Sequence, residues 1–179
     1  TKSPNGAETD LAVTNVYAAP VIAEKPFITI DDDGKYWLQV PSVKRRHVGP
    51  SSHLGLKEAG IKSVPFSKVF VATSTKNNAS DIQAKLDQGL HVVLTPGIYQ
   101  LSHSIVLKAR GQVLLGIGLA TLMAPIDGNP CIRVASGVSD VRVAGVMLGA
   151  SFITELSKAV NVSTLLEWGE HGKKDSGNP

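Results

Sequence analysis

The carboxylates in the second half of the chain are the side chains whose type is best suited to chemistry. They are Asp127, Asp140, Glu155, Glu167 and Glu170. Cleavage of a glycosidic bond commonly uses two carboxyl groups about 5–10 Å apart, one as an acid and the other as a base or nucleophile. Asp127 and Asp140 stand in turn sequences, where hydrogen bonds to the local backbone explain an aspartate fully. Glu155 and Glu167 are therefore the candidate catalytic residues, provided that both line one groove.

Aromatic residues are the second kind of candidate, because sugar rings stack on exposed aromatic faces. Trp37 and Trp168 are the candidate substrate-binding residues, and for each the alternative is a packed core aromatic. Tyr36 precedes Trp37 in the segment KYWLQVP, and successive side chains of a strand point to opposite faces. Only one of these two rings can therefore be buried by its strand. The same alternation can direct Glu167, in the aliphatic segment LLEWG, to solvent.

The residue pattern does not favour metal, cofactor or nucleic-acid chemistry. No histidines are spaced as zinc ligands, and His91 and His103, which lie in adjacent β-rich segments, are expected at the surface. The aspartates at 31–33 lack a calcium-loop pattern and are expected to form a solvated hairpin tip. The net charge of +3 comes from scattered Lys and Arg residues, and we interpret the one cluster, KRRH at 44–47, as a basic turn. We therefore expect no metal, no cofactor and no nucleic-acid partner.

A repeated pattern between residues 91 and 150 decides the fold class that would position these side chains. A short aliphatic run, a glycine and a second aliphatic run recur as HVVLTPGIYQL (91–101), QVLLGIGLATLM (112–123) and DVRVAGVMLGA (140–150). The glycines, Gly97, Gly118 and Gly145, are 21 and then 27 residues apart. Short β-rich units at such a period are typical of solenoids, in which each unit is stable only when stacked on a neighbour. We predict an all-β fold, the N-terminal portion of a parallel β-helix. An antiparallel sandwich is the alternative, although its strands would be longer and more strictly alternating.

A hairpin is predicted ahead of the repeats. The segments FITID (27–31) and KYWLQVP (35–41) flank Asp33 and Gly34. Asp-Gly between two β-prone segments is a strong hairpin signal, because the turn requires positive φ.

A short helix is predicted between the hairpin and the repeats, over residues 78–89. Ile82 and Leu86 lie on its apolar face, Gly89 ends it, and Ser80 is the expected N-cap, with Gln83 completing a capping box. A helix at this place would cover the unpaired edge of the first solenoid strand.

These elements divide the chain into three parts. Residues 1–20 form an extended N-terminal segment, residues 21–66 the hairpin and a long loop over 42–66, and residues 67–179 a strand at 67–72, the capping helix and the first coils of the β-helix. The single cysteine, Cys131, cannot close an internal disulfide and is expected to be a small buried hydrophobe. No run of ~18 apolar residues predicts a membrane span. Because no polar capping repeat follows the last strand, we expect the coils to continue beyond the chain end, in the same polypeptide or a companion chain.

The order of these elements resembles that of pectate-lyase-like right-handed β-helices. The helix followed by LDQGLHVVLTPGIYQL, SIVLKARGQVLLGIGLATL and VRVAGVML is most similar to secreted relatives of glycoside hydrolase family 55, the β-1,3-glucanases. Their first coil contains Pro-Gly-x-Tyr, matched here by Pro96, Gly97 and Tyr99, and the segment 24–45 resembles their preceding hairpin. Proline and glycine suit a tight corner, and Tyr99 is expected to pack its ring inside the coil with its hydroxyl at the rim. The resemblance implies a right-handed coil and a catalytic acid far downstream, past the end of this chain.

The function that the sequence favours is that of a secreted, carbohydrate-active β-helix that degrades an extracellular polysaccharide. The alternative is a non-catalytic extracellular structural or adhesive solenoid, and a weaker one is a trimeric viral spike. Asn78 and Asn161 each begin an Asn-x-Ser sequence and would carry glycans in a secreted eukaryotic protein. A groove with at least two acids and an exposed aromatic would favour the enzyme, whereas a flat glycosylated face would favour the structural role.

Overall fold

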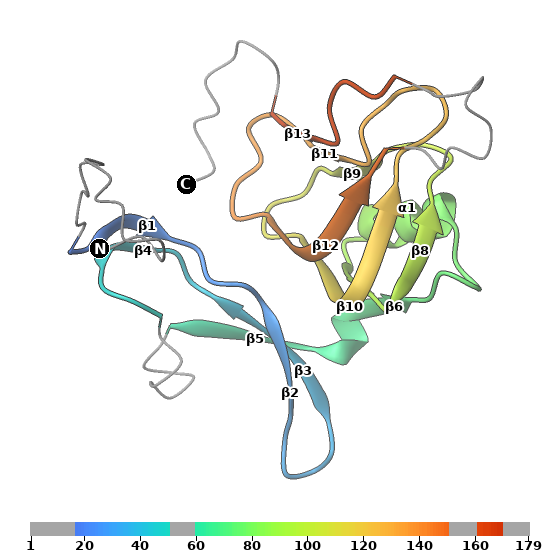
Figure 1. Ribbon diagram of the computed structural model, residues 1–179. Helices are drawn as coiled ribbons and strands as arrows, with labels where there is room; N and C mark the ends of the chain where they lie inside the picture. The colour runs from blue at the N-terminus through green and yellow to red at the C-terminus, as the bar shows by residue number, and fades with distance from the viewer. Residues whose placement is uncertain (1–16, 51–59, 151–160, 170–179) are drawn as a thin grey trace, which may run out of the picture.

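The computed structural model describes residues 17–50, 60–150 and 161–169 of the chain. These residues are mostly β, with one α-helix, and they form a body of parallel strands joined to an arm of antiparallel strands (Figure 1). The described part of the chain contains no helix with the length and hydrophobicity required to cross a bilayer.

Parallel strands form three stacks in the body, and the chain passes through them in a fixed order. Stack 1 contains β6 (Val69–Ala72), β7 (His91–Leu94) and the first parts of β10 (Val113–Met123) and β12 (Arg142–Gly149). Stack 2 contains β8 (Gly97–Gln100) and the second parts of β10 and β12. Stack 3 contains β9 (Ile105–Leu107), β11 (Ile132–Val134) and β13 (Leu166–Trp168). We call one passage from stack 1 through stack 2 to stack 3 a rung, and each predicted repeat begins a rung.

The repeated glycines lie at the corner between stacks 1 and 2. Strands β10 and β12 continue around this corner, and their mutual register shifts between Leu115 and Ala120. Gly118 and Gly145 have φ of +62° and +67°, a conformation that L side chains rarely adopt. Gly97 begins β8 immediately after the corner. The glycines are therefore corner residues that let one aliphatic run turn into the next.

Tyr99 joins the first rung to β6. Its ring is buried, and its hydroxyl lies 2.9 Å from the carbonyl oxygen of Ala72 and 3.0 Å from that of Thr95. The expectation that this hydroxyl stays at the rim is wrong, because two carbonyl groups inside the fold satisfy it there.

The interior between the three stacks is filled by aliphatic side chains. The residues with no exposed surface include Leu94, Ile105, Leu114, Leu122 and Ile132. Cys131 lies in the same cluster and is fully buried, which confirms it as a small buried hydrophobe, and its thiol donates to Leu122 O at 3.4 Å.

The helix α1 (Ala79–Asp87) lies against the first strands of the body, with Ile82 and Leu86 buried as predicted. Its N-cap is Asn78 and not Ser80. The Asn78 side chain accepts from the backbone N–H of Asp81, and the Asp81 carboxylate accepts from the backbone N–H of Asn78, so the capping box is two residues earlier than expected.

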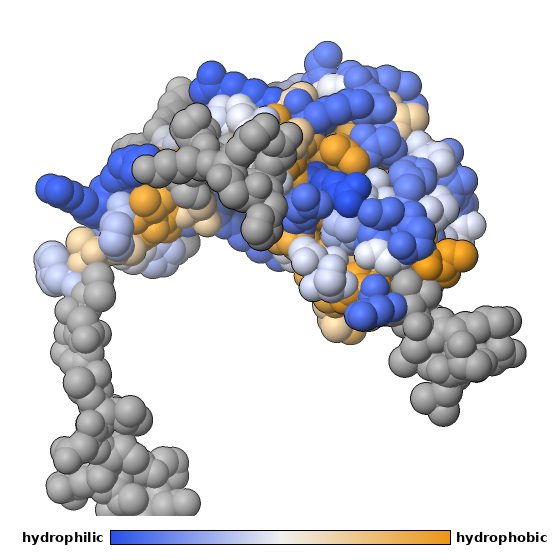
Figure 2. Space-filling model, turned by 90° about the horizontal axis from the view of Figure 1, so that it is seen from above, coloured by the Kyte–Doolittle hydropathy of each residue, from blue (hydrophilic) through white to orange (hydrophobic). Residues whose placement is uncertain are grey.

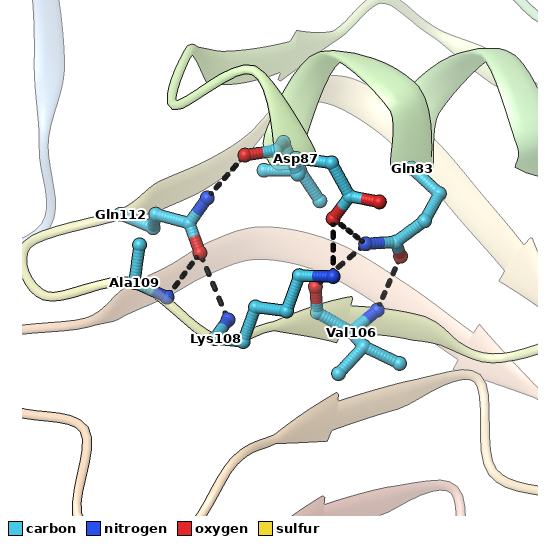
Figure 3. A network of polar contacts seen from close by, with 7 residues as sticks. Gln83, Asp87, Val106, Lys108, Ala109 and Gln112 are labelled. Carbon is cyan, nitrogen blue, oxygen red and sulfur yellow. Dashed lines mark hydrogen bonds and ion pairs between the residues drawn. The ribbon is translucent and has the colours of Figure 1, made fainter.

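Gln83 is thereby free to pair with the edge of stack 3. Its Oε1 accepts from the backbone N–H of Val106 at 2.7 Å, and its Nε2 donates to Val106 O at 3.1 Å (Figure 3). At the edge of β9, the Gln83 amide thus makes the two backbone hydrogen bonds that a neighbouring strand would make. Gln112 makes a second link between α1 and the body, since its Nε2 donates to Leu86 O at 2.8 Å and its Oε1 accepts from the N–H groups of Lys108 and Ala109.

The arm contains the predicted hairpin. Strands β2 (Phe27–Ile30) and β3 (Tyr36–Pro41) pair antiparallel, and Gly34, in the connection, has a φ of +77°. The sequence predicts a loop over 42–66, but this segment contains β4 (Lys44–His47) and β5 (Ile61–Pro65), followed by the short 3-10 helix η1 (Phe66–Lys68). Strand β5 pairs with β3, and β4 pairs with β1 (Ala19–Ile22). The basic cluster is therefore part of a strand and not a turn, because its backbone is paired with a strand from the beginning of the described chain.

The arm covers the outer face of stack 1. Leu38 of β3 and Val64 of β5 pack against Val93, Val113 and Leu115 of the body in a second buried cluster. Stack 1 is therefore apolar on both faces, as its near-continuous aliphatic sequence predicts for strands buried on both sides. On the face that Figure 2 presents, the surface of the described residues is mostly polar, with separate hydrophobic patches.

Candidate functional site

The candidate residues Glu167 and Trp168 lie together on β13, the strand of stack 3 that belongs to the third rung. A cavity of about 480 Å³ opens beside them. Its other walls include the turn 128–130, Arg133 of β11, and Ser163 and Thr164. Glu155, the second candidate acid, lies outside the described residues.

A chain of polar contacts runs along the wall of this cavity and continues to Asp127. The β11–β13 register places Arg133 directly opposite Glu167, and Arg133 Nε lies 2.7 Å from Glu167 Oε2. Arg133 Nη2 donates to Asn129 Oδ1 at 2.8 Å, and Asn129 Nδ2 donates to Asp127 Oδ2 at 2.7 Å. Two carboxylates are thus connected through one guanidinium and one amide. We call Asp127, Asn129, Arg133 and Glu167 the polar relay.

The polar relay presents both hydrogen-bond donors and acceptors, which suits it to binding hydroxyl groups. Hydrogen bonds from the backbone and the side chain of Asn129 lower the pKa of Asp127 below its usual value, and the charge of Arg133 adds to this. Glu167 is held in its ion pair and is the one carboxylate among the residues that line the cavity. A glycosidase acid must hold its proton at the working pH, and the lowered pKa of Asp127 does not suit that role.

Trp168 occupies a position that faces the core. It is opposite Val134 in the register, and Val134 is opposite Leu107, both of which are buried. Trp168 itself is 40% exposed, and it also lines a smaller cavity of about 240 Å³ with Lys25 and Val141. Trp168 therefore occupies the next place in a column of core residues, and its role in binding sugar stays a prediction.

Trp37 lies on β3 and lines a different cavity, on the face of the arm opposite to Leu38. Its indole Nε1 donates to Asp31 Oδ2 at 2.8 Å, and this bond is the first cause of a lowered pKa for Asp31. Beside it, Gln39 Nε2 donates to Thr29 Oγ1 at 2.8 Å, and Ser63 Oγ donates to Gln39 Oε1 at 2.6 Å. The structure therefore does not bring the two tryptophans into one cavity.

The remaining candidate positions are distributed over the surface. Asn78 and Asn161 are both exposed. His91 is half-buried with a buried Nδ1, so the expectation that it lies at the surface is wrong. Among the described residues, no group of three or more His, Cys, Asp and Glu side chains lies close enough to hold a metal ion.

Arg133 and Asn129 are the residues that sequence reasoning missed. Arg133 is 34 positions from Glu167, and only the β11–β13 register makes them neighbours. The available signal was the Asp-Gly-Asn turn immediately before an aliphatic strand that carries a single arginine.

The family of the chain follows from comparison with known proteins. The LAM55 pectate lyase-like domain matches residues 69–179, which is more than half of the chain. This chain belongs to the LAM55 pectate lyase-like family. The match confirms the relationship to pectate-lyase-like proteins of glycoside hydrolase family 55.

The relatives of this LAM55 chain include a protein that is named as an enzyme. The exo-β-1,3-glucanase of Streptomyces sp. (strain SirexAA-E / ActE) is 35% identical over 159 residues, which cover 89% of this chain and 24% of the relative. The structure of sacteLam55A from Streptomyces sp. SirexAA-E matches with a TM-score of 0.79 at 31% identity, over 98% of this chain and 30% of that one. A variant of sacteLam55A in complex with glucose matches with a TM-score of 0.72 at 33% identity, over 90% of this chain and 27% of that one. The LAM55 chain thus spans about a quarter of the curated relative that it matches.

Proposed function

We propose that this LAM55 chain is part of a secreted protein that degrades a β-1,3-glucan, and that its parallel strands form the beginning of a right-handed β-helix. The observation that carries the proposal is the 35% identity to an exo-β-1,3-glucanase over 89% of this chain. The passage of the chain through three parallel stacks in a fixed order supports the β-helix.

The described residues contribute a scaffold and a glucan contact surface, and the catalytic acid comes from polypeptide outside them. Support for this division comes from the polar relay, in which the Glu167 carboxylate is engaged by Arg133 and Asp127 is held ionised. An Arg–Asn pair flanked by carboxylates offers both donors and acceptors to the hydroxyl groups of a sugar. The cavity of about 480 Å³ at the relay is in the size range of small-ligand sites.

Binding to insoluble glucans tests this division of roles. We expect the chain to be retained by a β-1,3-glucan and not by a β-1,4-glucan, and to release no glucose from either. Glu167→Gln frees Arg133 from its ion pair and removes one charged acceptor, so retention should weaken about tenfold, the equivalent of one charge-assisted contact. Asp32→Asn, at an exposed carboxylate of the hairpin connection, is the matched control. Glucose release that is abolished by Glu167→Gln would instead make Glu167 a catalytic residue.

A non-catalytic structural or adhesive solenoid is the second candidate function. It is supported by the absence of a second carboxylate beside Glu167 among the residues that line the relay cavity. A chain that binds neither glucan, and whose natural full-length form does not hydrolyse β-1,3-glucan, would favour this function over the glucanase.

Secretion and continuation into further polypeptide are parts of the same proposal. The exposed Asn78 and Asn161 are available to a glycosylation system. Intact-mass measurement of the protein from its natural culture medium checks both points. We expect it outside the cells at a mass well above the 18.9 kDa of this chain, and a protein found only inside the cells would contradict secretion.

A further inference from the structure

A second cavity, which shares no residue with the polar relay, lies where the arm meets stack 1. It has a volume of about 420 Å³. The arm contributes mainly apolar residues and one cation, Lys62 of β5. The body contributes His91 at the start of β7, Arg142 at the start of β12, and the connections that hold Arg110 and Asp140. Of the residues considered in the sequence analysis, His91 and Asp140 line this cavity.

His91 and Arg142 face this cavity from the same outward column of stack 1. Arg142 is opposite Val113 in the parallel register, and the pairing of Val92 with Leu114 places His91 on the other side of Val113. Two strand spacings separate them, or about 10 Å between their backbones. Val113 lies between them and is fully buried in the second core cluster. His91 and Arg142 are therefore two nitrogen-bearing side chains on either side of an apolar surface. A sugar-sized molecule is long enough to contact both.

Both side chains have a buried nitrogen without a hydrogen-bond partner. Three such side-chain atoms occur in the described residues, and His91 Nδ1 and Arg142 Nε are two of them. Arg142 is only 9% exposed, and within the described residues its guanidinium makes one hydrogen bond, from Nη1 to the neighbouring Val141 O at 3.1 Å. Buried polar groups are nearly always satisfied, so two unsatisfied atoms in one column need an explanation.

The charges around the cavity are predominantly positive. Arg110 and Asp140 neutralise each other in an ion pair, with Arg110 Nε 2.9 Å from Asp140 Oδ2. Lys62 and Arg142 have no ion-pair partner within the described ranges. Burial and the positive charge of Lys62 lower the pKa of His91, which keeps it neutral and able to accept or donate a hydrogen bond. A buried guanidinium without a carboxylate is costly, and an anion in the cavity would remove that cost.

We propose that this cavity binds a small carboxylated sugar, a hexuronate or a related sugar acid. The carboxylate is held by Arg142 and Lys62, and a ring hydroxyl is held by His91. The apolar side chains of the arm, among them Val40 and Val64, contact the carbon–hydrogen face of the ring. This site is independent of the polar relay, with which it shares no residue.

Calorimetric titration of the chain with glucuronate and with glucose tests the proposal, because the two rings differ in the carboxylate alone. We expect glucuronate to bind at low ionic strength through Arg142, and we expect any glucose that binds at the polar relay to bind equally well to Arg142→Met. Acetate and sulfate are further probes that separate recognition of a sugar acid from recognition of any small anion. Acetate or sulfate that binds as tightly as glucuronate would make this a general anion site and overturn the sugar-acid proposal, and so would equal binding of glucose and glucuronate at this cavity.

Two variants keep the test decisive. Arg142→Met has a similar volume and removes the unpaired buried charge, so it should fold with an unchanged or raised Tm while weakening glucuronate binding at least about tenfold. Lys62→Ala changes an exposed position of β5 and should weaken binding to a smaller degree, even if the Arg142 variant does not fold. Lys76→Ala, a lysine outside the cavity, is the control and should bind as the unmodified chain does. Glucuronate binding that neither Arg142→Met nor Lys62→Ala weakens would overturn the assignment.

Discussion

The outward faces of stacks 1 and 2 are built from the same kind of aliphatic strand, but the first is buried and the second is exposed. In stack 1, Val93 and Leu115 are each 1% exposed. In stack 2, Ile98 and Met147 occupy outward positions of β8 and β12 and are each 53% exposed. The strands themselves do not account for this difference. It arises because the arm places Leu38 and Val64 over stack 1 and nothing comparable over stack 2 within the described residues.

The comparison shows that burial on the outside of a stack is decided by a distant part of the chain. The arm precedes the rungs in sequence, and its pairing is antiparallel, whereas all pairing within the body is parallel. An outward aliphatic residue is therefore a core residue or a surface residue according to what packs on it. The predictions below test this dependence, beginning with the largest expected effect.

Truncation of matched residues on the two faces should separate them most clearly. We expect Leu115→Ala to lower the free energy of unfolding by about 2–5 kcal/mol, because it opens a cavity in the second core. Ile98→Ala should change it by less than about 0.5 kcal/mol, as for an exposed site. Urea unfolding followed by circular dichroism measures both. Equal losses at the two positions would mean that the arm does not cover stack 1 in solution.

Removal of the Gln83 amide extends the comparison to the edge of stack 3. Gln83→Ala leaves the N–H and C=O of Val106 without their partner at a partly buried edge, which should cost about 1–3 kcal/mol. Gln88→Ala, an exposed glutamine at the end of the same helix, is the control and should cost less than about 0.5 kcal/mol. Hydrogen exchange at Val106 gives a local readout, and unchanged protection in Gln83→Ala would contradict the pairing.

Acid should weaken the contact between arm and stack 1 through His91. Burial, and then the charge of Lys62, lower the pKa of this histidine below its ordinary value of 6.5. Between the two values the unfolded chain binds a proton that the folded chain does not bind, so the free energy of unfolding falls as pH decreases below about 6.5. Above that pH this group has no effect. The other charged groups that line the cavity are Lys62, Arg110, Asp140 and Arg142.

The variant His91→Gln isolates that contribution. Its free energy of unfolding should decline less than that of the unmodified chain between about pH 6.5 and pH 5, as measured by urea unfolding at a series of pH values. His103→Gln, on the connection between β8 and β9, is the matched control and should retain the full decline. Identical pH profiles for His91→Gln and the unmodified chain would rule out the effect.

The smallest effect is expected on the bare face of stack 2. Met147→Thr places a polar β-branched residue at an exposed strand position, and its free energy of unfolding should stay within about 0.5 kcal/mol of the unmodified value. Thermal unfolding at two protein concentrations checks this. A large loss of stability, or a Tm that depends on concentration in the unmodified chain alone, would indicate that another molecule covers this face.

The sequence was informative wherever a local pattern carried the structure. Asp33 and Gly34 marked the hairpin because the turn itself needs their chemistry, and the repeated glycines marked the corners for the same reason. The relationship to pectate-lyase-like proteins followed from the order of these local patterns. Whether the rungs wind as a right-handed coil is a property of connections that the strand pattern does not specify.

The sequence-based predictions failed where pairing partners distant in sequence determine the local structure. Strands β4 and β5 are polar and weakly alternating, and they are strands because β1 and β3 pair with them. Asn78 and Ser80 are both good N-caps, and Gln83 fits a capping box from Ser80, so local rules could not choose between them. The pairing of Gln83 with Val106 settles the choice, because it uses the amide that a box from Ser80 would have required. Likewise, Glu167 was a candidate by its type, but its partner Arg133 depended on the strand register.

The corner between stacks 1 and 2 restricts how this sequence can change over evolutionary time. A Cβ added to Gly116 would overlap the backbone carbonyl of Gly145, and one added to Gly145 would overlap that of Gly116. A second substitution cannot remove main-chain atoms, so no other change in the sequence could make room for an alanine at either position. A Cβ added to Gly149 would lie 2.8 Å from the sulfur of the flexible Met123 side chain. A smaller residue at position 123 would make room for it. Among homologous chains that keep this corner, positions 116 and 145 should therefore remain glycine, whereas positions 123 and 149 should exchange volume as a pair.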